Sequence, residues 1–290
     1  MTGEQRPAPT GVTEELLDPA PVLALSSLFD DGNAEVRHGD LLPPLWHWAA
    51  LARWTASSRI GSDGHPVRGD DDPAAGLPRR MFAGGEVQLL APLRVGTTIR
   101  RASEILSVNE KTGRSGPFVV VTTETRLFAD AETPALIERQ DIVYRPAAEV
   151  RPGEARVAHA APPAGSPLRR ENDGWAFATD PTLLMRFSAA TANAHRIHYD
   201  WPYATGVEGY PALVVHGPLM TLALAEAVRL DFAERAVRVR HRNVAPLFCG
   251  QPAYISCTRT GSESVALAMQ SGPRDQPTTH TTLTVDFIEH

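Results

Sequence analysis

The chain has 290 residues, which is enough for one large domain or for two domains of ordinary size. With 42% hydrophobic residues, 21% charged residues and a net charge of -6, it is expected to form a packed core and to bind neither nucleic acid nor a membrane surface. The sequence has no apolar leader and no run near the ~18 apolar residues of a membrane span, which predicts a cytoplasmic protein. It has only two cysteines, which predicts reduced thiols.

In chain order, the first predicted element is an apolar helix over residues 42–54, "LPPLWHWAALARW". A polar, turn-rich run over 57–80 follows, and loops of that length inside a compact domain are often functional or disordered. Residues rich in β-branched side chains, separated by turn residues, then predict four strands. These strands cover 86–93, 97–111, 117–128 and 135–146.

A stretch rich in Pro, Ala and Gly, without a hydrophobic period, predicts a linker over 149–167. Beyond it, a short helix is predicted to begin at Pro181. A long apolar helix is predicted over 217–232, because Gly217 and the proline after it form a favoured helix start. Four more strands are predicted over 237–247, 252–261, 265–272 and 279–289.

Two short matches indicate that the halves of the chain repeat one unit. The sequence "APLRVG" at 91–96 recurs as "APLFCG" at 245–250, and "TTETRLF" has a counterpart, "TTLTVDF", near the end of the chain. In each half an apolar helix precedes a set of antiparallel strands. We therefore predict an α+β double hotdog, in which each unit has a long central helix wrapped by an antiparallel sheet, with units at 12–148 and 168–290.

The segment 193–201, "NAHRIHYDW", concentrates acid–base and hydrogen-bonding side chains. It is predicted to be an overhang between the short helix and the long one, where a rigid scaffold can present polar groups to a ligand. A proton relay, a metal site and a polar corner of the fold all fit this composition. Because His195 and His198 are three residues apart in a predicted loop, rather than four apart on a helix, we predict no metal.

The run "FSAATANAHRIHYDWPYATGVEGYPALVVHGPL" at 187–219 resembles the MaoC-like hotdog hydratases and dehydratases. The segments "LPPLWHWAAL", "DGHPVRG" and "PRRMFAGGEVQLLAPLRVG" resemble one branch of that family, which includes mesaconyl-C4-CoA hydratases and fungal-type mitochondrial 3-hydroxyacyl-thioester dehydratases. The resemblance covers roughly 15–145 and 168–288. It implies reversible hydration or dehydration of an acyl thioester, with a catalytic C-terminal unit and a non-catalytic N-terminal unit that helps to form the acyl site.

The resemblance also assigns catalytic residues. The wider family signature is Asp-x-Asn-Pro-x-His, and alignment on its last histidine places Asn193 at the aspartate and His198 at the histidine. An amide cannot take a proton from water as a carboxylate does, so Asn193 is expected to orient the water and His198 to act as both base and acid. His195 is expected to orient the imidazole, and Asp200 is expected either to fix the tautomer of a neighbouring imidazole or to cap the next turn. The alternative for His198 is a structural role that ties the overhang to the backbone.

Substrate contacts are expected from the start of the long helix and from cations. The "HG" element lines the acyl site in the family, so the Gly217 amide is expected to polarise the thioester carbonyl, and the role of His216 stays open. The alternative for Gly217 is a plain helix start. Guanidinium groups suit phosphates and carboxylates, and a glycine lets a pantetheine arm pass close to the backbone. The alternative for the arginines on strands is that they only form a solvent-exposed face of the sheet. The candidates are Arg79, Arg80, Gly84, Arg196, Arg238 and Arg240.

The sequence therefore predicts a hydro-lyase that acts on an acyl-CoA or acyl-carrier-protein thioester. No dissociable cofactor is expected, because CoA or the carrier pantetheine arrives as part of the substrate and no dinucleotide or P-loop glycine fingerprint occurs. A homodimer is compatible with the sequence. The alternative function is that of a non-catalytic acyl-thioester-binding or structural hotdog protein, which an asparagine at the aspartate position favours.

Overall fold

The computed structural model describes residues 10–69, 72–113, 116–147, 165–172 and 174–288. Its strands are β1 (Thr10–Leu16), β2 (Arg79–Leu89), β3 (Thr98–Gly113), β4 (Gly116–Phe128), β5 (Leu136–Arg145), β6 (Leu168–Glu171), β7 (Gly174–Phe177), β8 (Ala236–Asn243), β9 (Ala253–Arg259), β10 (Ser264–Ser271) and β11 (Thr278–Phe287). They form one antiparallel sheet in the order β1-β3-β4-β5-β2-β8-β11-β10-β9-β7-β6.

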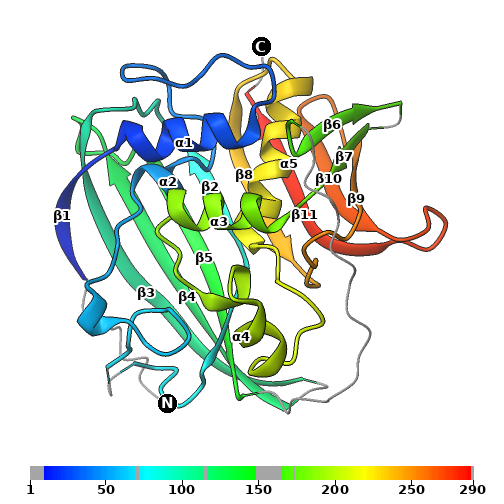
Figure 1. The fold of residues 1–290 in the computed structure, drawn as a ribbon. Helices are drawn as coiled ribbons and strands as arrows, with labels where there is room; N and C mark the ends of the chain where they lie inside the picture. Colours follow the sequence, from blue (N-terminus) through cyan, green and yellow to red (C-terminus); the bar gives the residue numbers. More distant parts are fainter. Residues whose placement is uncertain (1–9, 70–71, 114–115, 148–164, 173, 289–290) are drawn as a thin grey trace.

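The helices lie on one side of this curved sheet (Figure 1). They are α1 (Pro19–Phe29), α2 (His47–Ala50), α3 (Pro181–Ala190), α4 (Trp201–Gly206) and α5 (Gly217–Asp231), with short 3₁₀ turns η1 (Ser57–Arg59) and η2 (Arg196–His198). The longest is α5, which contacts β2, β10 and β11. The described helices include none that is long and apolar enough to cross a membrane.

The sheet joins the two halves of the chain without a break, because β2 of the first half pairs with β8 of the second. At this seam Gly84 and Gly85 lie opposite Arg242 and His241. A Cβ atom on Gly84 would lie 2.5 Å from the backbone oxygen of His241, so a side chain cannot fit. The close approach of two strands therefore accounts for this glycine.

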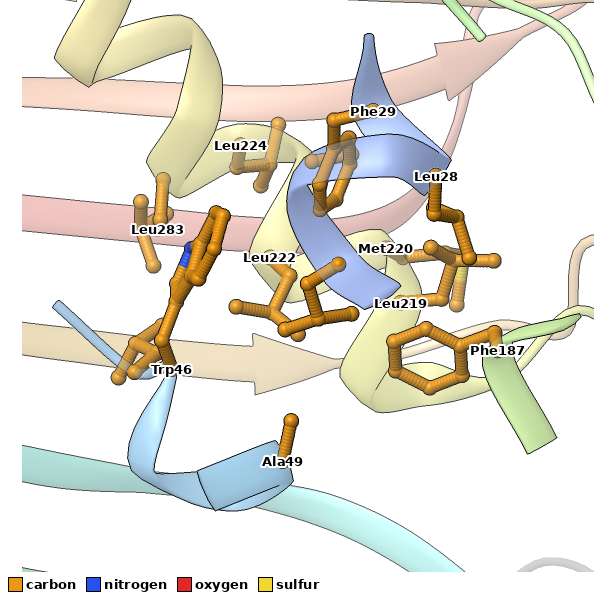
Figure 2. Packing of buried hydrophobic residues seen from close by; sticks show 14 of the residues in the cluster. Leu28, Phe29, Trp46, Ala49, Phe187, Leu219, Met220, Leu222, Leu224 and Leu283 are labelled. Atoms are coloured by element: carbon orange, nitrogen blue, oxygen red, sulfur yellow. The ribbon is translucent and has the colours of Figure 1, made fainter. Parts of the chain in front are cut away.

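The hydrophobic core forms where α5 meets helices from both halves. Figure 2 shows Leu219, Met220 and Leu222 of α5 close to side chains of α1, α2 and α3. Ten consecutive α5 residues are buried, as expected of a helix that is apolar on all sides. Trp46 is fully buried in this cluster, and its Nε1 donates a hydrogen bond of 2.6 Å to Glu226 of α5.

The eight predicted strands are confirmed as β2 to β5 and β8 to β11, and the central helix of the second half is confirmed as α5. The long helix predicted over 42–54 is wrong, since this segment contains only the single turn α2. Pro43 and Pro44 disfavour helix in their neighbourhood, and Leu45 has a left-handed φ of 69°. The main helix of the first half is α1, which was not predicted although Asp18 caps it by accepting the Ala20 amide at 2.9 Å.

Three strands near the ends of the sheet were not predicted either: β1 at one end, and β7 and β6 at the other, which have only four residues each. Both cysteines, Cys249 and Cys257, are free, in agreement with the prediction of reduced thiols. Residues 149–164 of the predicted linker over 149–167 lie outside the residues that the structure describes.

Candidate active site

The overhang that carries the polar cluster begins where α3 ends. Asp180 caps α3 by accepting the amides of Thr182 and Leu183 at 2.6 and 3.2 Å, and the helix stops before Ala192, whose φ is 48°. The chain then turns through η2, and Asp200 accepts the Tyr203 amide at 3.1 Å to cap α4. Asp200 is therefore a capping residue, one of the two roles that its position suggested.

His198, on η2, is buried and lines a large cavity. Its Nδ1 donates a hydrogen bond of 2.7 Å to the backbone oxygen of Val214, which fixes Nε2 as the basic nitrogen. Burial lowers the pKa of His198 to about 4, because the desolvated imidazolium is disfavoured. At neutral pH the ring is therefore uncharged and can accept a proton at Nε2.

His216 lies directly behind His198. The two rings stack with centroids 3.6 Å apart and planes 18° apart, and the His216 Nε2 is hydrogen-bonded to Ser188 Oγ at 2.9 Å. His216 is fully buried, and burial followed by the charges of neighbouring histidines lowers its pKa well below the usual value. His216 is not among the cavity-lining residues, and its ring packs against His198 and Phe187.

Asn193 and His195 both line the cavity, as the sequence predicted for a site. The Asn193 Oδ1 accepts the His195 amide at 3.0 Å, so one of the two lone pairs of this oxygen serves the local turn. The His195 ring stands perpendicular to His198, with centroids 5.5 Å apart. Burial, and then the charges of His65 and His198, lower the pKa of His195 to about 2, so it stays neutral.

The cavity has a volume of about 810 Å³ and is lined by residues of both halves. Gly217, the first residue of α5, lies on its wall, and the first amides of a helix have no acceptor within the helix. A Cβ atom on Gly217 would lie 3.2 Å from Phe82 and 3.3 Å from Asn243. The positive end of α5 therefore lies at the cavity wall, where the side chains of Phe82 and Asn243 leave little room for a residue larger than glycine.

Several residues of the cavity were missed by the sequence reasoning. Asn243 of β8 lines it beside Gly217, and neither polar atom of its buried side-chain amide has a hydrogen-bond partner among the described residues. His65 also lines it, with its ring 4.1 Å from that of His195. His65 and Asp63 belong to the "DGHPVRG" segment, which carried part of the family resemblance but to which no role was assigned.

Only one of the predicted substrate-binding residues, Arg80, lines this cavity. The others have different surroundings: Gly84 packs at the strand seam, Arg79 pairs with Glu208, Arg196 with Asp200, Arg238 with Glu86 and Arg240 with Asp286. The cavity wall instead contains Arg101 and Arg145, which the sequence reasoning did not select. Strand alternation shows which residues share a face, but not which face is the inner one.

A metal site would need several donor atoms free to converge. Among the described residues, Asp63, His65 and His195 bring their donor atoms within 4.8 Å of one another. His65 Nδ1 and Asp63 Oδ2, however, already lie 3.2 Å apart in a hydrogen bond, which is the arrangement of an Asp–His pair. His198 and Asp200 do not take part in this cluster.

Comparisons with known proteins agree with this architecture. Residues 45–249 match the family model described as hydroxyacyl-thioester dehydratase type 2. A mesaconyl-C(4)-CoA hydratase of Chloroflexus aurantiacus is 40% identical over 241 residues, which is 82% of this chain and 83% of that protein.

Solved structures of lower identity share the fold. A MaoC-like dehydratase from Phytophthora capsici has a TM-score of 0.67 at 14% identity and covers 98% of this chain and 97% of its own. A Mycobacterium tuberculosis protein described as a double hotdog fold has a TM-score of 0.54 at 13% identity over 97% of each chain. The chain therefore belongs to the hydroxyacyl-thioester dehydratase type 2 family and has the double hotdog fold.

Proposed function

We propose that the protein is a hydro-lyase that catalyses reversible hydration and dehydration of an acyl-CoA thioester. The observation that carries this proposal is the pairing of two features in one cavity. His198 has its Nδ1 hydrogen-bonded to a backbone oxygen and its Nε2 available as a base, and the amino end of α5 opens on the same space at Gly217. The match to the hydroxyacyl-thioester dehydratase type 2 family and the 40% identity with a mesaconyl-C(4)-CoA hydratase support this reading.

The chemistry follows from these positions. The thioester carbonyl accepts a hydrogen bond from the Gly217 amide, and the helix dipole stabilises the enolate that develops on its oxygen. Nε2 of His198 takes a proton from water as the water oxygen bonds to Cβ of the enoyl group. A proton is then delivered to Cα, and the enolate returns to the thioester. No dissociable cofactor is needed for these steps, because the thioester itself accepts the electron pair.

The acyl carrier in this proposal is CoA, and the acyl group is that of a C4-dicarboxylic enoyl thioester. The 40% identity with a mesaconyl-C(4)-CoA hydratase over most of both chains supports it. Three arginines line the cavity, and guanidinium groups suit the phosphates of CoA and a second carboxylate. These are Arg80, Arg101 and Arg145.

A second candidate function is binding of acyl thioesters without turnover. Asn193 favours it, because an amide stands where the wider family has a carboxylate and its oxygen is already engaged by the His195 amide. Loss of enoyl absorbance on mixing the protein with a panel of C4-dicarboxylic and straight-chain enoyl-CoA thioesters separates the two functions. Absence of turnover with the whole panel would reject the hydratase function. Loss of turnover in His198→Gln, which can still donate to the Val214 backbone oxygen, at a melting temperature near that of the wild type, is the result expected of an enzyme.

A further inference from the structure

A loop of the N-terminal half is fixed onto the catalytic overhang. The Arg196 amide donates a hydrogen bond of 2.9 Å to the Asp63 backbone oxygen, and the Arg196 guanidinium donates one of 2.8 Å to the Ser62 backbone oxygen. Gly64 has a φ of 90°, and a side chain there would overlap the backbone oxygen of Ala194. The loop and the overhang are therefore in contact over several residues, and a glycine is required between Asp63 and His65.

Within this loop, Asp63 holds His65 in one orientation. The Asp63 Oδ1 accepts the His65 backbone amide at 2.9 Å, and Oδ2 lies 3.2 Å from the His65 Nδ1. Burial opposes ionisation of Asp63, but the hydrogen bonds from His65 outweigh it and lower the pKa of this carboxyl to about 2. Asp63 is thus a carboxylate at neutral pH, and an Nδ1–H facing it leaves Nε2 of His65 as the second functional nitrogen.

His65 shares the cavity with the catalytic candidates. It lines the same cavity as His195 and His198, and its ring centroid is 4.1 Å from that of His195. The charged and titratable groups near it are Asp63 in its own loop, His195 and His198 on the overhang, and Arg80 of β2. A positive charge on His65 would lie beside the Asp63 carboxylate, whereas the rings that contact His198 are the imidazoles of His195 and His216.

We propose that Asp63 and His65 form the second acid–base group of the hydration site, in place of the carboxylate that is absent at Asn193. This inference rests on the proposed hydratase function. It assigns a catalytic residue, His65, and a positioning residue, Asp63, to the N-terminal half, which the sequence had suggested to be non-catalytic. The reacting groups of the site then come from both hotdog units.

The two imidazoles divide the proton transfers. Nε2 of His198 takes a proton from water while the water oxygen bonds to Cβ, and the π electrons of the double bond move onto the thioester as an enolate. The Nε2 proton of the His65 imidazolium then passes to Cα, which gives the 3-hydroxyacyl thioester and a neutral His65. A proton moves from His198 to His65 through solvent in the open cavity and restores the starting state. The sum of these steps is the addition of one water.

The test compares Asp63→Asn and His65→Gln with the wild type, and uses Asp72→Asn as the matched control. Asp72 lies in the same polar run and accepts the Ala74 amide at 2.7 Å, but it is not part of the Asp63–His65–His195 cluster. Asparagine at position 63 keeps the turn but presents an N–H to His65 Nδ1, which forces the wrong tautomer. We expect kcat for the enoyl-CoA to fall about 10²-fold or more in both variants. KM, the Kd of the 3-hydroxyacyl-CoA product and the melting temperature should stay near wild type.

The split between kcat and KM distinguishes proton transfer from a structural role. In both variants kcat should fall while KM and the Kd of the product stay near wild type, because only the proton transfer to Cα is lost. Wild-type kcat in both variants would overturn the inference and leave the hydratase function intact. A loss of kcat that is accompanied by lost product binding and a lower melting temperature would also overturn it. Inactivation by a chelator that added Zn²⁺ reverses would replace the pair with a metal site. A wild type without turnover would overturn the function and this inference together.

Discussion

Replacement of His198 by Gln should make the folded protein less sensitive to acid. Burial holds the pKa of His198 at about 4, against an ordinary value of 6.5, so the unfolded chain binds a proton at this residue that the folded chain does not. The stability due to the neutral ring is complete above pH 6.5 and is lost as the pH falls toward 4. The two pKa values give a loss of about 2 kcal/mol in the free energy of unfolding between pH 7 and pH 5.

Urea unfolding at pH 7 and pH 5 measures this loss. Glutamine can still donate to the Val214 backbone oxygen but does not titrate, so the variant should lose about 2 kcal/mol less than the wild type over this range. His38→Gln, at an exposed position, is the control for the substitution itself. Equal losses in His198→Gln and in the wild type would refute the argument that His198 is held neutral by burial.

Three further substitutions test the site. Asn243→Ala should lower kcat at least tenfold. The melting temperature should stay level or rise, because an unpaired buried amide costs about 1–3 kcal/mol of stability. Unchanged kcat would exclude Asn243 from the site. Gly217→Ala should lower both kcat/KM and the melting temperature, since its Cβ atom would lie 3.2 Å from Phe82; full activity would show that the substrate carbonyl does not approach this amide. Arg196→Ala should speed proteolysis near Ser62 and lower kcat, because the contact with the Ser62 backbone oxygen is lost; proteolysis at the wild-type rate would show that this contact does not hold the loop.

The sequence by itself determined the features that depend on near neighbours. Strands β2 to β5 and β8 to β11 followed from alternating β-branched residues and the turns between them, and α5 followed from Gly217 and the proline after it. Family motifs singled out His198. Its tautomer and lowered pKa could not be predicted, because the tautomer depends on the Val214 backbone oxygen and the pKa depends on burial by distant parts of the chain.

Only the tertiary structure decided which side chains meet in the cavity. Arg196 and Ser62 are 134 residues apart in sequence, and their contact exists because the overhang of one half docks on a loop of the other. The same docking brings His65 beside His195, so the "DGHPVRG" segment acquires its position at the site from a distant part of the chain. Local propensity does not carry this information, because the free energy that selects the docked arrangement comes from burial and hydrogen bonds between the halves.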